Sequence, residues 1–405
     1  MKLILFTLLA FTLNFNGSSQ ESSDETTGIQ FVTGTWEEVV AIAKKEKKPI
    51  FVDAFTTWCG PCKWMAKNTF TDADVAAFMS DNFIAYKMDM EKGEGIEFAK
   101  KNKVNLYPTL LYFDSKGEFI HRTAGALKPE GFIETGRTAL DPKERFGTFQ
   151  RKFERGDSDK KFLLNYIAKS DKAGVSSEEP FNKYWSLLND EEKITEDNLV
   201  LMQSITRGFA DLDHELFVFL KANKAKYIGK IGADKFQPFW DQAYKNAVWY
   251  AGKEKKASNR KAKLEKAKST FTGKKNEIDA FYDMNLAWQS RDKDKIKTAA
   301  AVYVEVTTDW EFLNTEAWTV YEESDDNEEL ERALIWANKS VDLNANYMNL
   351  DTKGALLYRL KHYEKAVNAL EEAIEKADES VRSEDLNSTE TLLREIIMEM
   401  QETDD

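Results

Sequence analysis

The spacing of hydrophobic and polar positions changes near residue 142 and divides the chain into two regions. Between residues 31 and 142, short apolar runs alternate with amphipathic stretches. The runs at 50–55, 83–89 and 109–113 have the length and composition of buried strands. Beyond residue 142, apolar residues recur every three or four positions up to the C-terminus, which is typical of helices. The pattern predicts an α/β domain at 31–142 and an all-α domain at 143–405.

Local signals set the element boundaries in the first region. Thr35 and Glu38 form the capping-box pattern that opens a helix, and Pro49 ends that helix before the first apolar run. Gly117 marks a turn that leads into a return strand at 118–122. Further helices are predicted after residue 59, at 74–79, at 96–101 and from 129 to about 140. We therefore expect strands and helices to alternate throughout this region.

The end of the helical region contains an internal repeat. Its clearest copy places small and large apolar residues at fixed offsets, namely Gly354, Leu357, Tyr363, Ala366, Leu370 and Ala373. A weaker copy, Ala333, Ala337 and Ser340, precedes the last three of these by 33 positions. This spacing resembles the tetratricopeptide repeat, a pair of helices that spans about 34 residues. Small residues let the two helices approach, and larger ones fill the gap between neighbouring pairs. We expect such helical hairpins near 316–378.

The N-terminus has the features of a secretory signal. A basic start precedes an apolar run at 3–13, which is too short to span a bilayer because a spanning helix takes about 20 residues. Small residues at positions 17 and 19 fit a signal-peptidase site. A buried strand is the alternative, but a polar stretch follows. The sequence predicts a signal peptide at 1–19, a flexible leader at 20–30 and an exported protein, periplasmic or secreted, without a transmembrane segment.

Composition narrows the partners and the chemistry. The formal net charge of −13 argues against nucleic acid as a partner. The chain has 405 residues but only two cysteines, so it has no disulfide framework. Both cysteines lie in one heptad, Thr-Trp-Cys-Gly-Pro-Cys-Lys, at 57–63. The sulfur chemistry of the whole chain is therefore concentrated in four residues.

The spacing of the two cysteines favours an asymmetric reactive pair. A helix that begins at Cys59 places this thiol at the helix N-terminus, where free amides and the helix dipole stabilise a thiolate. Gly60 allows the backbone to bend, and Pro61 is tolerated in the first helical turn because its missing N–H would be unbonded there. Cys62 lies one turn deeper. The arrangement predicts an outer nucleophile and an inner resolving thiol.

Three other roles for the cysteine pair fit the sequence less well. A zinc site needs four ligands, and none of the three histidines, His121, His214 and His362, is spaced as a partner. A purely structural disulfide across two residues would close a very small loop and restrain little. Two inert core thiols would not explain the Gly-Pro between them. Redox exchange fits best, and it requires neither a metal nor a cofactor beyond the cysteine pair.

Three stretches resemble the thioredoxin family: Val52-Asp53-Ala54-Phe55, Trp58-Cys59-Gly60-Pro61-Cys62-Lys63 and Tyr107-Pro108-Thr109. The resemblance covers roughly 31–140 and implies the α/β thioredoxin fold, a central mixed sheet flanked by helices. It also implies thiol–disulfide oxidoreduction, in which Cys59 attacks a disulfide and Cys62 resolves the mixed disulfide. Asp53 would be a buried acid that assists proton transfer for Cys62.

The same resemblance assigns the lining of the site. Trp58 would flank the cysteine pair, and Pro108 would be a cis-proline that faces the disulfide and lines the substrate groove. The remaining lining residues would be Gly60, Pro61, Lys63, Tyr107 and Thr109. The chain departs from the family pattern at Thr56-Thr57 and at Tyr107, which affects redox potential and partner choice.

Two functions follow from the sequence. The first is an exported thiol–disulfide oxidoreductase that acts on protein substrates, exchanges electrons with a thiol donor or acceptor, and uses its helical domain to recruit partners. The alternative is an interaction scaffold of the cell envelope in which redox activity is incidental. The intact cysteine pair and Asp53 favour the enzyme.

Overall fold

The computed structural model describes residues 28–379 and 381–404 and consists of two compact units. The first unit ends at Asn189 and the second begins at Asp190. The predicted signal peptide, 1–19, and most of the predicted leader lie outside the described residues.

The first unit contains five strands and eight helices among its described residues. In chain order they are β1 (Phe31–Val32), α1 (Trp36–Glu46), β2 (Ile50–Phe55), α2 (Gly60–Asn68), α3 (Ala73–Asn82), β3 (Ile84–Asp89), α4 (Gly95–Lys101), β4 (Thr109–Phe113), β5 (Phe119–Ala124), α5 (Pro129–Leu140), α6 (Phe146–Glu154), α7 (Lys160–Lys172) and α8 (Glu178–Ser186).

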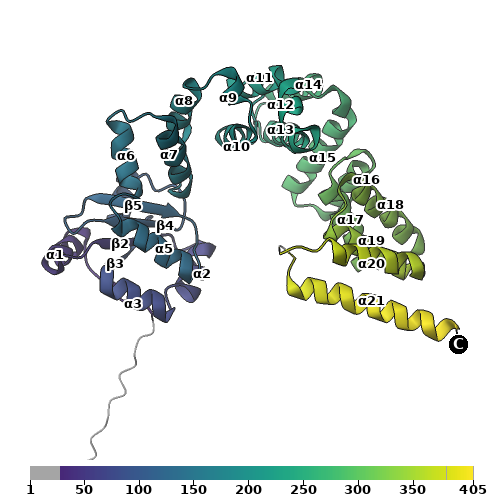
Figure 1. Ribbon diagram of the computed structural model, residues 1–405, viewed down its shortest axis with the longest axis horizontal. Helices are drawn as coiled ribbons and strands as arrows, with labels where there is room; N and C mark the ends of the chain where they lie inside the picture. The colour runs from purple at the N-terminus through teal and green to yellow at the C-terminus, as the bar shows by residue number, and fades with distance from the viewer. Residues whose placement is uncertain (1–27, 380, 405) are drawn as a thin grey trace, which may run out of the picture. The chain divides into compact units, whose positions relative to one another are not determined.

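The strands form one mixed sheet in the order β1-β3-β2-β4-β5. β1, β3 and β2 run parallel, whereas β4 and β5 are antiparallel to their neighbours. One face of the sheet is covered by α2, α3 and α5, and Phe51 and Met65 are buried together there (Figure 1). The other face is covered by α1 and α4, and Val52 and Phe98 are buried there. This arrangement of helices on both faces of a mixed sheet is the predicted thioredoxin fold.

Local sequence signals account for most element boundaries. Thr35 caps α1 and forms a reciprocal capping box with Glu38, as predicted. Pro129 begins α5, and Gly117 adopts a φ of 84° in the turn before β5. The hydrophobic pattern does not predict β1, because this strand has two residues and is defined by its pairing with β3.

The first unit continues past the predicted domain boundary at residue 142, because α6 packs on β5, α7 packs on α6, and α8 packs on α7. Phe146 and Tyr166 of the added helices stack with their ring centroids 5.8 Å apart, and Phe119 of β5 packs beside them. Buried Arg122 of β5 donates hydrogen bonds to the carbonyl of Ala173 at 2.8 Å and that of Asn102 at 2.7 Å. Ala173 and Asn102 are the C-cap residues of α7 and α4, so one guanidinium caps both helix ends and ties them to the sheet.

His121 of β5 is buried, although a histidine in a return strand would by its residue type be expected at the surface. Its Nδ1 accepts a hydrogen bond from the backbone N–H of Phe146 at 3.0 Å, and its Nε2 lies 3.2 Å from the hydroxyl of Thr135. Burial lowers the pKa of His121 to about 3, so the ring is neutral at physiological pH. His121 is buried for the same reason that the first unit extends past residue 142, namely that α6 covers this part of β5.

We expect a fragment that ends at residue 142 to be much less stable than one that ends at residue 189. The shorter fragment exposes the β5 surface and leaves Arg122 without its Ala173 partner. Loss of this apolar packing should lower the free energy of unfolding by about 3 kcal/mol or more. Urea unfolding of residues 20–142 and 20–189 tests this. Equal stabilities would mean that α6–α8 do not support the domain.

The second unit contains only helices among its described residues. They are α9 (Asp190–Lys193), α10 (Glu196–Ile205), α11 (Glu215–Ala222), α12 (Lys224–Ile231), α13 (Ala233–Gly252), α14 (Ala257–Thr270), the 3₁₀ helix η1 (Thr272–Lys274), α15 (Lys275–Ser290), α16 (Lys293–Val306), α17 (Trp310–Glu323), α18 (Asn327–Asn344), α19 (Tyr347–Arg359), α20 (Tyr363–Glu375) and α21 (Ser383–Asp404). This is the predicted all-α region.

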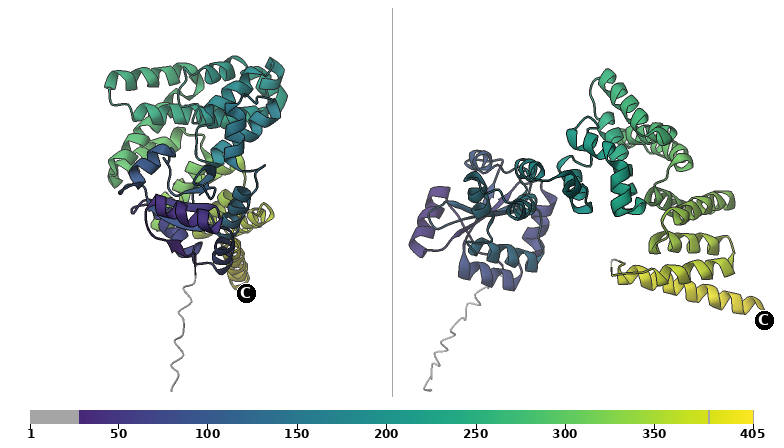
Figure 2. Two further views of the ribbon diagram at one scale, coloured as in Figure 1. Left: turned by 90° about the vertical axis from the view of Figure 1, so that its left-hand side faces the viewer. Right: turned by 45° about the horizontal axis from the view of Figure 1, so that its top comes forward.

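Consecutive helices of this unit pack in pairs, and the green-to-yellow helices lie side by side in the right-hand view of Figure 2. In the pair α19–α20, a Cβ atom built on Gly354 would lie 2.5 Å from the side chain of Leu370, so only glycine permits this approach. Ala366 and Ala373 of α20 are fully buried. The small residues of the sequence repeat therefore lie where neighbouring helices meet.

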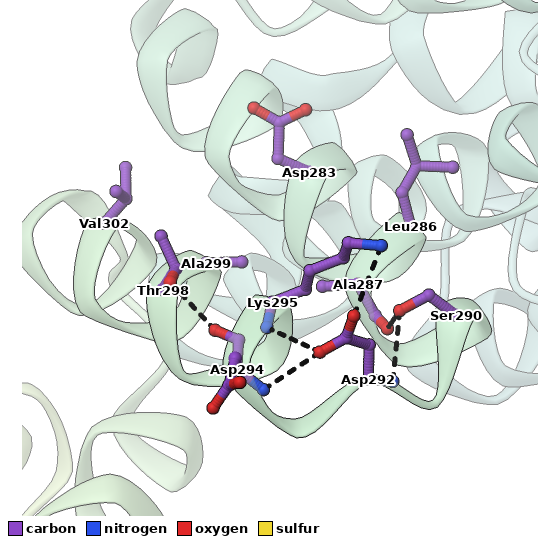
Figure 3. A pocket seen from close by; sticks show the side chains of 10 residues that line it. All are labelled: Asp283, Leu286, Ala287, Ser290, Asp292, Asp294, Lys295, Thr298, Ala299 and Val302. Atoms are coloured by element: carbon purple, nitrogen blue, oxygen red, sulfur yellow. Dashed lines mark hydrogen bonds and ion pairs between the residues drawn. The ribbon is translucent and has the colours of Figure 1, made fainter.

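A shallow hollow lies between α15 and α16 (Figure 3). Asp292 begins α16 by accepting hydrogen bonds from the backbone N–H groups of Asp294 and Lys295, and it also pairs with the Lys295 ammonium at 3.3 Å. The Asp292 carboxylate therefore has its hydrogen-bond and charge partners within the first turn of α16. Among the described residues of both units, no helix combines the length and apolarity needed to cross a membrane.

Candidate functional site

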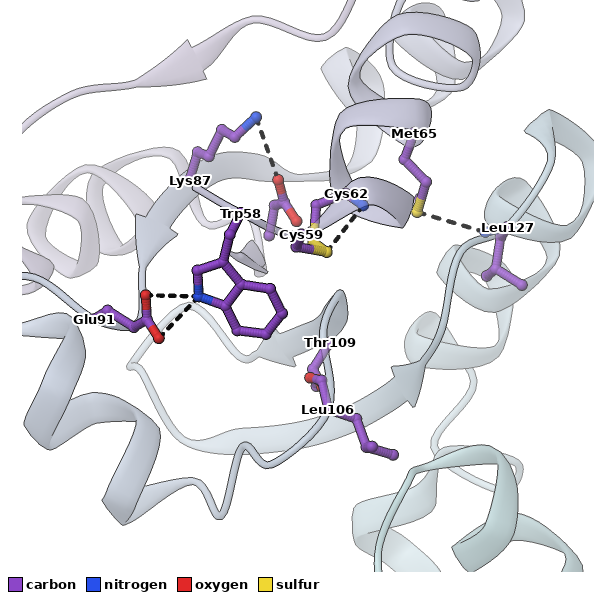
Figure 4. The surroundings of a disulfide bond; sticks show 10 residues. Trp58, Cys59, Cys62, Met65, Lys87, Glu91, Leu106, Thr109 and Leu127 are labelled. Carbon is purple, nitrogen blue, oxygen red and sulfur yellow. Dashed lines mark hydrogen bonds and ion pairs between the residues drawn. A yellow bond between two sulfur atoms is a disulfide. The ribbon is translucent and has the colours of Figure 1, made fainter. Parts of the chain in front are cut away.

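The two cysteines form a disulfide at the start of α2 (Figure 4). Cys59 is the N-cap residue of this helix, and its Sγ accepts a hydrogen bond from the backbone N–H of Cys62 at 3.0 Å. In the reduced protein the same N–H would favour a thiolate on Cys59. Both cysteines are buried, so access to the pair depends on the side chains and loops around it.

Asp53 lies beneath the helix that carries the cysteines. It follows Phe51 by two positions on β2, so both side chains point to the sheet face that α2 covers. The Asp53 side chain is 1% exposed, and its oxygens accept no hydrogen bond within the described chain. Burial raises the pKa of Asp53 to about 6, although the positive charge of Lys87 opposes this shift.

Among the described residues, Lys87 is the one charged partner of Asp53. It lies opposite Asp53 on β3, and its Nζ is 3.6 Å from the carboxylate, beyond hydrogen-bond distance. The ammonium also lies over the Phe55 ring, 4.8 Å from its centroid, and one third of the side chain is exposed. Sequence reasoning missed this residue, although a lysine inside an otherwise buried strand is a signal that it has a partner.

Trp58 projects beside the disulfide and is 65% exposed. Its indole N–H donates to both carboxylate oxygens of Glu91, at 3.0 and 2.9 Å, and its ring meets the edge of Tyr107 with centroids 5.9 Å apart. Glu91 therefore holds an exposed aromatic side chain in one orientation. The sequence does not indicate this contact, because the two residues are brought together only by the fold.

The Tyr107–Pro108 peptide bond is cis, and Pro108 is buried. Next to it, the buried hydroxyl of Thr109 donates to the carbonyl of Leu106 at 2.7 Å, while the Pro108 carbonyl accepts from the N–H of Gly125 at 2.9 Å. These bonds fix the loop that precedes β4. Leu106 itself is 53% exposed and lies at the edge of the site.

The remaining predicted lining residues lie in the first turn of α2. Gly60, Pro61 and Lys63 are all exposed, and Pro61 occupies the predicted position where a missing N–H is tolerated. A Cβ atom on Gly60 would meet nothing within 4 Å, and its φ is not positive. The bend that the sequence suggested at Gly60 therefore does not depend on glycine.

A family profile described as thioredoxin-like matches residues 31–115. Residues 31–115 are a thioredoxin-like domain. The match covers the strand with Asp53, the cysteine pair and the loop with Pro108, which are the stretches that carried the resemblance in the sequence.

Several known proteins are similar to this thioredoxin-like domain. Thioredoxin Y of rice, a chloroplastic protein, is 30% identical over 113 residues, 28% of this chain and 64% of its own. Thiol:disulfide interchange protein DsbD of Vibrio vulnificus is 29% identical over 128 residues, 30% of this chain and 21% of its own. A solved structure of a candidate disulphide-isomerase from Bacteroides thetaiotaomicron is 42% identical, covers 29% of this chain and 97% of its own, and has a TM-score of 0.28. This chain thus spans less than two thirds of the length of both curated relatives.

Proposed function

We propose that this protein is an exported thiol–disulfide oxidoreductase that exchanges disulfides with protein substrates through Cys59 and Cys62. The observation that carries the proposal is the disulfide at the N-terminus of α2, above a buried carboxyl group whose pKa is raised to about 6. A purely structural disulfide would require neither feature. The names of the similar proteins, which include a thioredoxin and a thiol:disulfide interchange protein, support the same chemistry.

The proposed reaction proceeds in two steps. In the reduced protein, the Cys59 thiolate attacks one sulfur of a substrate disulfide; the substrate S–S bond breaks, a mixed disulfide forms, and the second substrate sulfur leaves as a thiolate. Cys62 then loses its proton and attacks the Cys59 sulfur, which releases the first substrate sulfur. Two electrons pass from the cysteine pair to the substrate, and an external thiol donor must restore the pair. The reverse sequence oxidises substrate thiols.

Asp53 is proposed as the acceptor of the Cys62 proton. A carboxyl group with a pKa of about 6 is largely ionised at pH 7, yet basic enough to take up a proton transiently. No cofactor or metal is needed beyond the cysteine pair. Trp58, Tyr107 and Pro108 would form the surface that the substrate meets.

The helical unit is proposed to recruit partners. Its last hairpins carry the spacing of tetratricopeptide-like repeats, and stacked hairpins make extended surfaces suited to protein partners. A tethered binding surface raises the effective concentration of cargo at the redox site. The predicted signal peptide at 1–19 supports export to the periplasm or beyond.

Thiol labelling before and after reduction tests the proposed chemistry. Full-length protein should show no reactive thiol as isolated in the disulfide form and two after dithiothreitol, and the reduced protein should lose both again on addition of a substrate disulfide. A Cys59→Ser variant should fail to turn over. A pair that cannot be reduced under native conditions, or that reduces no disulfide, would favour the scaffold alternative.

A further inference from the structure

A cleft of about 850 Å³ lies within the first unit, between the thioredoxin-like domain and the helices α6–α8 that follow it, which we call the helical extension. The loop after α4 forms one wall, and the turn between α7 and α8 forms the other. Its floor is aromatic, with Phe119 from β5, Phe146 and Phe153 from α6, and Tyr166 from α7. The ring centroids of Phe153 and Tyr166 are 5.2 Å apart, and the buried side chain of Arg122 also lines the cleft beside these rings.

The cleft adjoins the redox site through one short segment. Asn105 lines the cleft, and Pro108 is three residues further along the chain, directly after Tyr107, whose ring contacts Trp58 next to Cys59. Three residues span at most about 11 Å, so this edge of the cleft lies within that distance of the loop that contacts Trp58. The turn after α7 also reaches this loop, since a Cβ atom on Gly174 would lie 3.1 Å from the side chain of Leu106.

The rim of the cleft is charged. Glu154, Glu178 and Glu179 lie on the side of α6 and α8, and Lys101 and Lys103 lie on the opposite side. Burial raises the pKa of Tyr166 at the cleft floor, and the negative charges of Glu154 and Glu179 raise it further. Within the described residues, neither Glu178 nor Glu179 forms an ion pair, so their charges are free to meet a ligand.

We propose that this cleft is a substrate subsite, which binds a peptide segment three to four residues from the substrate cysteine. The segment would place an apolar or aromatic side chain on the aromatic floor and a neighbouring lysine or arginine against Glu178 and Glu179. The inference rests on the proposed function. It makes the helical extension responsible for selectivity among protein substrates.

Peptide disulfides of matched sequence test the subsite. Each probe is a homodimer of one short peptide joined through its single cysteine, with Trp-Lys, Trp-Glu or Ser-Ser at the third and fourth positions on either side. Hydroxyethyl disulfide, which is too short to reach the cleft, gives the reference rate. Mixed-disulfide formation is measured with the full-length Cys62→Ser protein, and each peptide rate is divided by the reference rate to cancel general effects on the cysteine.

The Trp-Lys probe should react several times faster than the Ser-Ser probe, relative to the reference. Glu178→Gln combined with Glu179→Gln should reduce this preference about fivefold, because two exposed charge contacts are lost. The double charge reversal, Glu178→Lys with Glu179→Lys, should move the preference to Trp-Glu, a gain that misfolding cannot produce. Glu37→Gln with Glu46→Gln on α1 removes the same charge elsewhere and should leave the preference intact.

A protein that reacts with hydroxyethyl disulfide but shows no preference among the peptides overturns the subsite and leaves the proposed function standing. Binding is also measured without chemistry, by fluorescence anisotropy of a labelled Trp-Lys peptide with serine in place of cysteine. Binding that the charge reversal abolishes supports the subsite even if no disulfide is reduced, in which case the proposed function fails. Absence of binding together with absence of preference overturns the subsite.

Discussion

The Cys62→Ser variant should accumulate stable mixed disulfides with its substrates. Cys59 keeps its place at the start of α2 and can still attack, but the thiol that would release the substrate is gone. The loss of turnover should be close to complete, as it should be for Cys59→Ser. Non-reducing electrophoresis of the protein expressed in its native compartment should show adducts that dithiothreitol removes.

The matched variant Cys59→Ser should form no such adducts, because Cys62 lies one turn deeper and is not the helix N-cap. Equal trapping by the two variants would contradict the assignment of Cys59 as the nucleophile. Comparison of full-length Cys62→Ser with the same variant of residues 20–189 tests recruitment by the helical unit. We expect the shorter protein to trap model disulfides equally well and to lose selectivity among natural partners; identical partner profiles would contradict recruitment.

The Asp53→Asn variant should be more stable than the wild type above pH 6 and about equally stable near pH 4. The folded protein holds the Asp53 proton more tightly than the unfolded chain does, because its pKa rises from 3.8 to about 6. Ionisation of Asp53 therefore costs no stability below pH 4, a growing amount between pH 4 and 6, and a constant amount above pH 6. A shift of about two units corresponds to roughly 3 kcal/mol. Urea unfolding of residues 20–189 at pH 4 and pH 8 measures the difference.

The same substitution should slow the resolution of mixed disulfides by up to about 100-fold near pH 7, because the proton acceptor is lost while side-chain volume is kept. In the wild type, resolution should slow as the pH falls through about 6, where Asp53 becomes protonated. Lys87→Gln is the opposing control: without the ammonium, the pKa of Asp53 should rise further and stability at pH 8 should fall. A stabilisation by Asp53→Asn that is independent of pH would contradict the raised pKa.

Those parts of the fold that depend on local signals could be predicted from the sequence. The capping pair Thr35 and Glu38, the apolar run of β4 and the helix start at Pro129 all lie where the sequence places them. In each case the residues that determine the structure are neighbours in the chain, so a periodic pattern or a cap is sufficient evidence.

Features that arise from tertiary contacts could not be predicted in this way. His121 and Arg122 are polar residues in a return strand, and only the packing of α6 and α7 against β5 buries them. Glu91 lies 33 residues from Trp58 in sequence, and its role depends on where β3 ends. The candidate site shows the same division: the cysteines were evident in one heptad, whereas the charged partner of Asp53 and the cleft were not.

The contact of Arg122 with two helix ends has a consequence for how this chain can be recombined. The thioredoxin-like match stops at residue 115, yet the guanidinium that follows it bonds to carbonyl groups on both sides of that point, at Asn102 and Ala173. A crossover at the end of the match would separate the arginine from one of its partners. Residues 31–189 should therefore be inherited, grafted or swapped as one block, and a chimera that joins a foreign thioredoxin-like domain to α6 would need its own arginine at this place.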